Sequence, residues 1–149
     1  MPDSDSHDPA SQSTTGADVA SCVIRVASLE QSARFYCQVF DCKVVIRERD
    51  MLLLSTPKGF QIYLHQAANL RPRREDELGI QFMVWATDSE SEQRRIAERM
   101  RAQDVAVYCH SVAGMTILEG VDPDGSRVVV ACPGPGQMPC THIAPRLRA

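Results

Sequence analysis

Apolar and polar positions alternate along this chain in two units of the same kind. Each unit opens on a segment with the period-2 pattern of a strand, at residues 21–27 and 78–86, and continues into a segment of helical period, at residues 28–36 and about 88–103. Further strand-like segments follow each helix. This repeated order predicts an α+β fold of two βαβββ modules, whose curved mixed sheets surround a pocket.

Both predicted helices carry start signals. Ser28, with Gln31 three residues later, matches a capping box, and either Asp88 or Ser89 caps the second helix. The second helix has Glu in its first turn and Arg in its last turn, an arrangement that suits the helix dipole. A tight turn is expected at 122–125, where a glycine supplies the positive φ.

The two ends of the chain and its middle are polar and lack periodicity. Residues 1–18 hold almost no large apolar side chain, so we expect a disordered tail there, and the proline-rich residues 133–149 are expected to form a loose C-terminal tail. The charged segment 67–77 is interpreted as a linker, with a lid over a pocket as the alternative. The predicted domain spans residues 19–132, divided into modules 19–66 and 78–132.

Composition and charge indicate which kinds of binding partner and which cellular compartment to expect. A net charge of −3 and the lack of an apolar run of about 18 residues favour neither a nucleic-acid partner nor a membrane. The six cysteines show no zinc-finger spacing. Because the N-terminus lacks the features of an export signal, we expect reduced thiols and a cytoplasmic protein.

The faces of the predicted strands differ in character. One face of each strand is uniformly apolar and is expected to pack on the helices, whereas the other mixes cationic, amide, aromatic and sulfur-containing side chains. This mixed face suits a concave small-molecule pocket, and a dimer interface is the alternative. The predicted ligand-binding residues are Arg25, Gln61, Tyr63, His65, Gln81, Met83, Trp85 and Arg127.

Two segments resemble the vicinal-oxygen-chelate superfamily, which includes glyoxalase I, bleomycin-resistance proteins and extradiol dioxygenases. Residues 23–36, with Ser32-Ala-Arg-Phe-Tyr36, are similar to the opening strand and helix of that superfamily. The segment Asp122-Pro-Asp-Gly-Ser-Arg-Val-Val-Val130 is similar to its closing hairpin. The resemblance covers about residues 20–133 and implies the fold more than the chemistry, because this fold supports many reactions.

The resemblance also implies positions for a metal site. Metal enzymes of the superfamily hold a divalent ion with four side chains, and aligning the motifs places those positions at Ser21, Gln61, Gly79 and Val129. Of these residues, Gln61 is the one with a suitable donor, whereas divalent ions need about four to six donors. We therefore expect neither a metal nor another cofactor, and no catalytic residue is assigned.

Individual residues leave alternatives open. Arg25 aligns with an arginine that contacts substrate carboxylate in glyoxalase-like proteins, and the alternative is an internal ion pair with Glu119. His65 is either a general base or a surface residue at a strand end. Tyr63 and Trp85 are suited to stacking on a planar ligand, with packing in the core as the alternative.

The favoured hypothesis is a homodimeric protein that binds a small organic ligand, anionic or aromatic, without a metal, and sequesters a drug or metabolite. One alternative is a lyase, isomerase or dioxygenase with a displaced metal site, with Gln61, His65 and Glu119 as donors. Another is an interaction module without a pocket, which predicts a partner surface over Trp85 and Met83.

Overall fold

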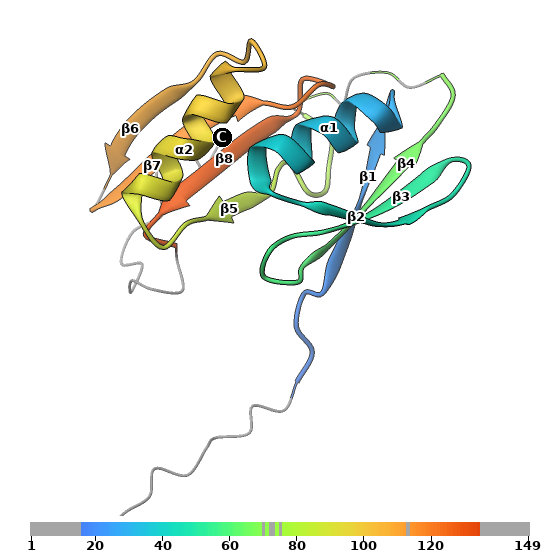
Figure 1. Ribbon diagram of the computed structural model, residues 1–149, viewed down its shortest axis with the longest axis horizontal. Helices are drawn as coiled ribbons and strands as arrows, with labels where there is room; N and C mark the ends of the chain where they lie inside the picture. Colours follow the sequence, from blue (N-terminus) through green and yellow to red (C-terminus); the bar gives the residue numbers. More distant parts are fainter. Residues whose placement is uncertain (1–15, 70, 72–73, 75, 113, 135–149) are drawn as a thin grey trace, which may run out of the picture.

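Two modules with the same element order follow one another in the computed structural model, which describes residues 16–69, 71, 74, 76–112 and 114–134 (Figure 1). The elements of the first module are β1 (Ser21–Val26), α1 (Leu29–Phe40), β2 (Lys43–Arg47), β3 (Met51–Ser55) and β4 (Gln61–Gln66). Those of the second module are β5 (Val84–Ala86), α2 (Glu90–Arg101), β6 (Tyr108–Val112), β7 (Met115–Val121) and β8 (Arg127–Cys132).

Each module forms one four-stranded mixed sheet. Sheet 1 has the order β1-β4-β3-β2 and sheet 2 has the order β5-β8-β7-β6. In each sheet the first strand of the module pairs in parallel with the last, and the other pairs are antiparallel. The predicted α+β fold of two βαβββ modules is confirmed.

The helix starts follow from their capping residues. The Ser28 hydroxyl accepts a hydrogen bond from the backbone N–H of Gln31 at 3.3 Å, and the Ser89 hydroxyl accepts one from the backbone N–H of Glu92 at 3.2 Å. These bonds satisfy N–H groups that the first turn of a helix leaves without a partner. Of the two caps considered for the second helix, the structure therefore selects Ser89.

One hydrophobic core joins the two modules. Both helices lie against their own sheets and against each other, and apolar side chains from α1, α2 and the helix-facing sides of both sheets form a single cluster. Its buried members include Val26, Phe35, Tyr36, Leu52, Ile62, Leu64, Ile96, Met100, Leu118, Val128 and Val130. The helices occupy one side of each sheet, and the opposite side, on which no helix packs, is here termed the uncovered face. On sheet 2 this face is nonetheless buried, since Ile117, Val129 and Ala131 are 1%, 0% and 2% exposed.

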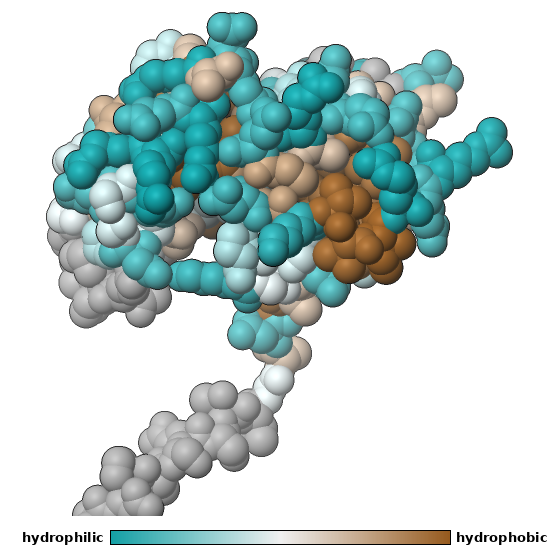
Figure 2. Space-filling view, in the orientation of Figure 1, coloured by the Kyte–Doolittle hydropathy of each residue, from teal (hydrophilic) through white to brown (hydrophobic). Residues whose placement is uncertain are grey.

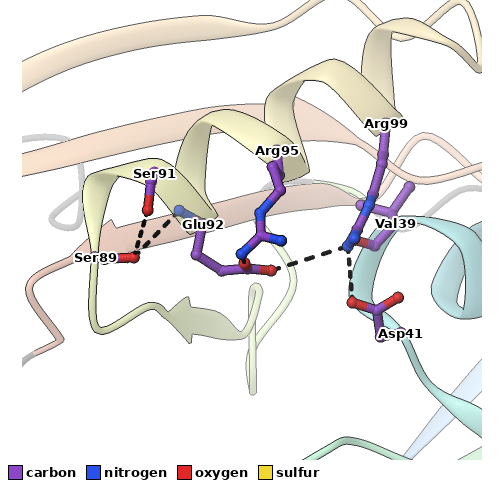
Figure 3. A network of polar contacts seen from close by, with 7 residues as sticks. All are labelled: Val39, Asp41, Ser89, Ser91, Glu92, Arg95 and Arg99. Atoms are coloured by element: carbon purple, nitrogen blue, oxygen red, sulfur yellow. Dashed lines mark hydrogen bonds and ion pairs between the residues drawn. The ribbon is translucent and has the colours of Figure 1, made fainter.

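A polar network also connects the modules at the C-terminal end of α1 (Figure 3). Arg99 of α2 donates through Nη1 to the carbonyl of Val39 at 3.3 Å and to Oδ2 of Asp41 at 2.8 Å. Asp41 is the C-cap of α1 and has a left-handed backbone with φ 55°. Glu92 Oε1 lies 3.9 Å from the same guanidinium nitrogen. Arg99 thus places a cation at the negative end of the α1 dipole.

The predicted strand at 78–86 is shorter than expected, since only Val84–Ala86 is a strand. The register explains this difference. Val84 pairs with Val129 of β8 in parallel, so Arg127, the first residue of β8, lies opposite residue 82. Residues 78–81 therefore precede the start of β8 and have no backbone ladder to join.

Some predictions fall largely outside the described residues. Of the predicted tails, the structure describes only residues 16–18 and 133–134, and it describes 67–69, 71, 74, 76 and 77 of the linker. The five cysteines in the described residues are free thiols, namely Cys22, Cys37, Cys42, Cys109 and Cys132. No helix among the described residues is long and apolar enough to cross a membrane.

Candidate functional site

The uncovered face of sheet 1 brings together four of the predicted ligand-binding residues. Residues that pair across neighbouring strands point to the same side of a sheet, so the register arranges the side chains of this face in rows. The rows cross β1, β4 and β3 in the order Arg25–His65–Met51, Val23–Tyr63–Leu53 and Ser21–Gln61–Ser55. Polar side chains thus lie on both sides of a largely apolar middle row.

Arg25 is exposed on this face and has no counter-charge among the described residues. The sequence left open an ion pair between Arg25 and Glu119. The structure contradicts that alternative, because Glu119 lies in sheet 2 and pairs with Arg127. The Arg25 guanidinium, with donors in a planar fork, is therefore placed where an external anion can reach it.

The neighbours of Arg25 add aromatic and titratable groups. His65 lies directly beside Arg25 in the register, and its Nε2 is 3.8 Å from Oδ2 of Asp50, which forms an ion pair only when the imidazole is protonated. Tyr63, in the next row, is half-buried, and within the described part of the chain its hydroxyl forms no hydrogen bond. Val23, opposite Tyr63, is 64% exposed. This corner of the sheet offers a cation, an aromatic ring and apolar area.

The uncovered face of sheet 2 holds a charged cluster that the sequence analysis largely missed. Arg127 donates through Nε to Oε1 of Glu119 at 2.9 Å, and its guanidinium carbon lies 4.4 Å from the centre of the Phe82 ring. The Glu119 side chain is only 5% exposed. His110 Nδ1 is 3.9 Å from Oε2 of Glu119, and its buried Nε2 has no hydrogen-bond partner in the described residues.

A sequence signal for this cluster exists. Glu119 is the one charged residue in the largely buried β7. The hairpin that turns at 122–125 pairs Glu119 with Val129, which makes Arg127 its diagonal neighbour on the same face. A carboxylate in a buried strand next to an arginine of the partner strand predicts an ion pair.

Two further predicted residues, Met83 and Trp85, contact the core side of the sheets and not the mixed face, which is a correction. Trp85 pairs with Val130, points to the helix side and stacks on Phe40 with ring centres 3.8 Å apart. The Cys22 thiol donates to the sulfur of Met83 at 3.3 Å, so Met83 also contacts the core side of sheet 1.

Gln81 contacts its own loop. Its amide nitrogen donates to the carbonyls of Glu77 and Gly79 at 2.8 and 3.0 Å. The residue of this segment that lies on the uncovered face is Phe82, whereas the sequence predicts Met83 and Trp85 there. Phe82 packs on Met115, Ile117, Val129 and Ala131. Alternation along a strand shows which residues share a face of the sheet. The register with the neighbouring strand decides whether that face is the helix side or the uncovered side, and for Met83 and Trp85 the prediction chose the wrong one.

The positions that the resemblance implies for a metal do not fit one. Gly79 has no side chain, and Val129 is apolar and 0% exposed. Ser21 and Gln61 pair directly across β1 and β4 and are neutral oxygen donors. The described residues contain no group of three or more His, Cys, Asp or Glu side chains that could hold a metal ion.

Comparison with known proteins places the architecture among solved structures. No protein-family model and no curated protein matches the chain. A glyoxylase/bleomycin resistance protein/dioxygenase domain from Frankia sp. EAN1pec is similar with a TM-score of 0.74 and 19% identity, over 80% of this chain and 100% of that chain. A lactoylglutathione lyase from Agrobacterium tumefaciens is similar with a TM-score of 0.62 and 18% identity, over 79% of this chain and 95% of that chain.

A third similar structure is described as a possible glyoxalase from Bacillus cereus. It has a TM-score of 0.65 and 16% identity, over 78% of this chain and 100% of that chain. Each of these solved chains is matched over nearly its whole length, so the similarity includes both modules and their arrangement.

Proposed function

We propose that this chain, whose fold is that of the glyoxalase and bleomycin-resistance proteins, is a cytoplasmic protein that binds a small organic molecule without a metal. The ligand carries an anionic group and an aromatic or apolar body. Arg25 carries the proposal, because its exposed guanidinium lacks a counter-charge among the described residues and lies beside Tyr63 and His65. Sequestration of a drug or metabolite is the role that this binding would serve.

The physical chemistry of the face supports this ligand class. A guanidinium binds a carboxylate through two parallel N–H donors, and such charge-assisted bonds are about twice as strong as neutral ones. In the row next to Arg25, Val23 is 64% exposed and Tyr63 is half-buried, so these two side chains provide apolar area for the body of the ligand. The donor set at Ser21, Gln61, Gly79 and Val129 favours binding without a metal, because it provides no anionic or imidazole ligand.

We further propose that the protein is a homodimer in which a second copy covers β2. This strand is the edge of sheet 1, so one side of its backbone is open to pairing. Val44, Val45 and Ile46 of β2 are 40%, 58% and 50% exposed, and Figure 2 shows an apolar patch over β2 and β3. Light scattering after size exclusion is expected to give twice the chain mass for the wild type and the single mass for Val45→Glu. A monomeric wild type at about 100 μM contradicts the dimer.

Binding is tested by calorimetry with 4-biphenylcarboxylate as the probe, compared with the neutral 4-biphenylcarboxamide. Arg25→Gln is expected to weaken carboxylate binding about tenfold or more, as loss of a charged hydrogen bond does. Arg49→Gln is the matched control, because Arg49 is also exposed and has no counter-charge among the described residues. Equal affinity for carboxylate and carboxamide, or no effect of Arg25→Gln, contradicts the proposal.

The same experiment separates binding from metal-dependent catalysis. Protein purified without added metal and treated with EDTA is expected to bind the probe as before. A stoichiometric divalent ion in elemental analysis, together with loss of binding on its removal and on Gln61→Ala, would favour an enzyme of the lyase, isomerase or dioxygenase type instead.

A further inference from the structure

A groove of about 210 Å³ lies at the junction of the two modules, away from both uncovered faces. Its lining residues come from α1, from the segment after α2, and from the turn between β7 and β8. They are Gln31, Arg34, Phe35, Gln103, Val105, Asp122 and Pro123. About seven water molecules occupy this volume in the liquid. It is smaller than a pocket for a drug-sized molecule, which spans about 300–1,000 Å³, so it suits a molecule with a single ring.

The walls of the groove are held in place by hydrogen bonds between α1 and the turn. The Tyr36 hydroxyl donates to Oδ2 of Asp122 at 3.0 Å, and the Ser32 hydroxyl donates to Oδ2 of Asp124 at 3.4 Å. Oδ1 of Asp122 accepts from the backbone N–H groups of Asp124 and Ser126 at 3.0 and 2.9 Å. The turn is therefore fixed against the helix, and the shape of the groove is preorganised.

Asp122 is part of the wall and is not a group for binding ligands. Both of its oxygens accept hydrogen bonds from the protein, and the residue is only 4% exposed. The apolar surface that a ligand can reach comes from Val105 and Pro123, because Phe35 is only 1% exposed and forms part of the wall. The remaining charged group of the lining is the guanidinium of Arg34.

Arg34 lacks the partner that its position on the helix would normally provide. The residue one turn before it is Glu30, whose carboxylate pairs with Arg47 at 2.6 Å. The residue one turn after it is Gln38, whose Oε1 accepts from Nε2 of Gln103 at 3.2 Å. Among the described residues Arg34 forms neither a hydrogen bond nor an ion pair. An exposed cation without a counter-charge among the described residues thus lies at a groove of mixed polar and apolar lining.

We propose that this groove is a second binding site, for a small aromatic monocarboxylate of the size of benzoate. The carboxylate binds the fork of Arg34, with the side-chain amide of Gln31 as a further donor. The ring lies against Val105 and Pro123. The site differs from the face around Arg25 in residues and in location, and it does not depend on the function proposed for that face.

The test uses benzoate as the probe and NMR of uniformly ¹⁵N-labelled full-length protein carrying Arg25→Gln, so that the face of sheet 1 does not compete. Benzoate is expected to shift the amide signals of residues 31–35, 103–105 and 122–125 in a saturable manner. Adding Arg34→Gln is expected to weaken this binding about tenfold or more, whereas Arg34→Lys retains part of it because the charge remains. The neutral analogue benzamide is expected to leave these signals unchanged.

Controls decide whether the site is specific. Arg94→Gln removes another exposed helical arginine, one that lies near Glu90 on α2, and is expected to leave benzoate binding unchanged. Shifts that persist in Arg34→Gln, shifts confined to residues of sheet 1, or equal binding of benzamide overturn the proposal. Because Arg34 is exposed and without contacts to lose, its variants are expected to fold, which the dispersion of the amide signals verifies.

Discussion

The ring of Trp85 lies 3.8 Å from that of Phe40, with the two planes 12° apart. The two residues belong to different modules, β5 and α1, and Tyr36 stacks on the same indole at 6.0 Å. Trp85, which the sequence predicts to contact a ligand, is thereby a link between the modules. Offset stacking of this kind contributes about 0.5–1.5 kcal/mol beyond the burial of apolar area.

Trp85→Ala is expected to lower the free energy of unfolding by about 3 kcal/mol, at the low end of the range for large aromatic residues, because Trp85 is only partly buried. Trp85→Phe keeps a ring over Phe40 and is expected to lose less. Urea denaturation followed by circular dichroism measures both variants. A Trp85→Ala protein of unchanged stability that no longer binds an aromatic carboxylate would restore the role in ligand binding.

The prediction of fold succeeded where local signals and tertiary packing agree. Helix caps at Ser28 and Ser89, the glycine turn at 122–125 and the two-fold repeat of the element order are local features, and the structure has all of them. The resemblance drawn from the opening and closing segments is also confirmed at the level of fold by the solved structures.

The prediction of the site was limited by the register between strands, which depends on residues far apart in the sequence. On β1, β4 and β8, alternation gave the correct faces, because one face of each strand is continuously apolar. In the segment before β5 both faces are apolar or mixed, and the short ladder with β8 sets the side on which Phe82 and Trp85 lie. The partner of Glu119 also depends on strand pairing. Because β7 and β8 are neighbours in sheet 2, Glu119 pairs with Arg127 and not with Arg25, which lies in sheet 1.

The contact between Arg99 and Asp41 predicts a modest contribution to stability. The pair is partly exposed, with side chains 32% and 55% accessible, so its ionic part contributes less than about 1 kcal/mol. Arg99→Ala also removes the donor to the Val39 carbonyl, and we expect a total loss of about 1 kcal/mol in urea denaturation. Asp41→Asn, which tolerates the left-handed backbone, is expected to lose less. An equal loss in 1 M NaCl and in low salt would contradict an ionic contribution.

Asp122 predicts a pH dependence of stability. Burial raises the pKa of this carboxyl above its ordinary value of 3.8, against the hydrogen bonds from Ser126, Tyr36 and Asp124, which lower it. The native state then holds the proton more tightly than the unfolded state, so this group favours folding below pH 3.8 and loses that contribution as the pH rises through the raised pKa.

Asp122→Asn removes this titration. The free energy of unfolding of the wild type minus that of Asp122→Asn is therefore expected to fall as the pH is raised from about 3 to 7. Urea denaturation of both proteins at steps of half a pH unit measures the difference, in which the titration of carboxyls that do not interact with Asp122 cancels. A difference that stays constant or rises with pH contradicts the raised pKa.

The ion pair of Glu119 and Arg127 predicts that removing one charge destabilises the fold more than removing both. Glu119→Ala leaves the partly buried Arg127 without this carboxylate and is expected to cost about 3 kcal/mol in the free energy of unfolding. The double variant Glu119→Leu/Arg127→Leu removes both charges, and we expect it to regain most of that loss, because apolar residues replace buried ion pairs at little cost. Urea denaturation of Glu119→Leu, Arg127→Leu and the double variant gives the coupling between the two residues. If the double variant is as unstable as Glu119→Ala, the loss in Glu119→Ala does not come from leaving the Arg127 charge without its carboxylate.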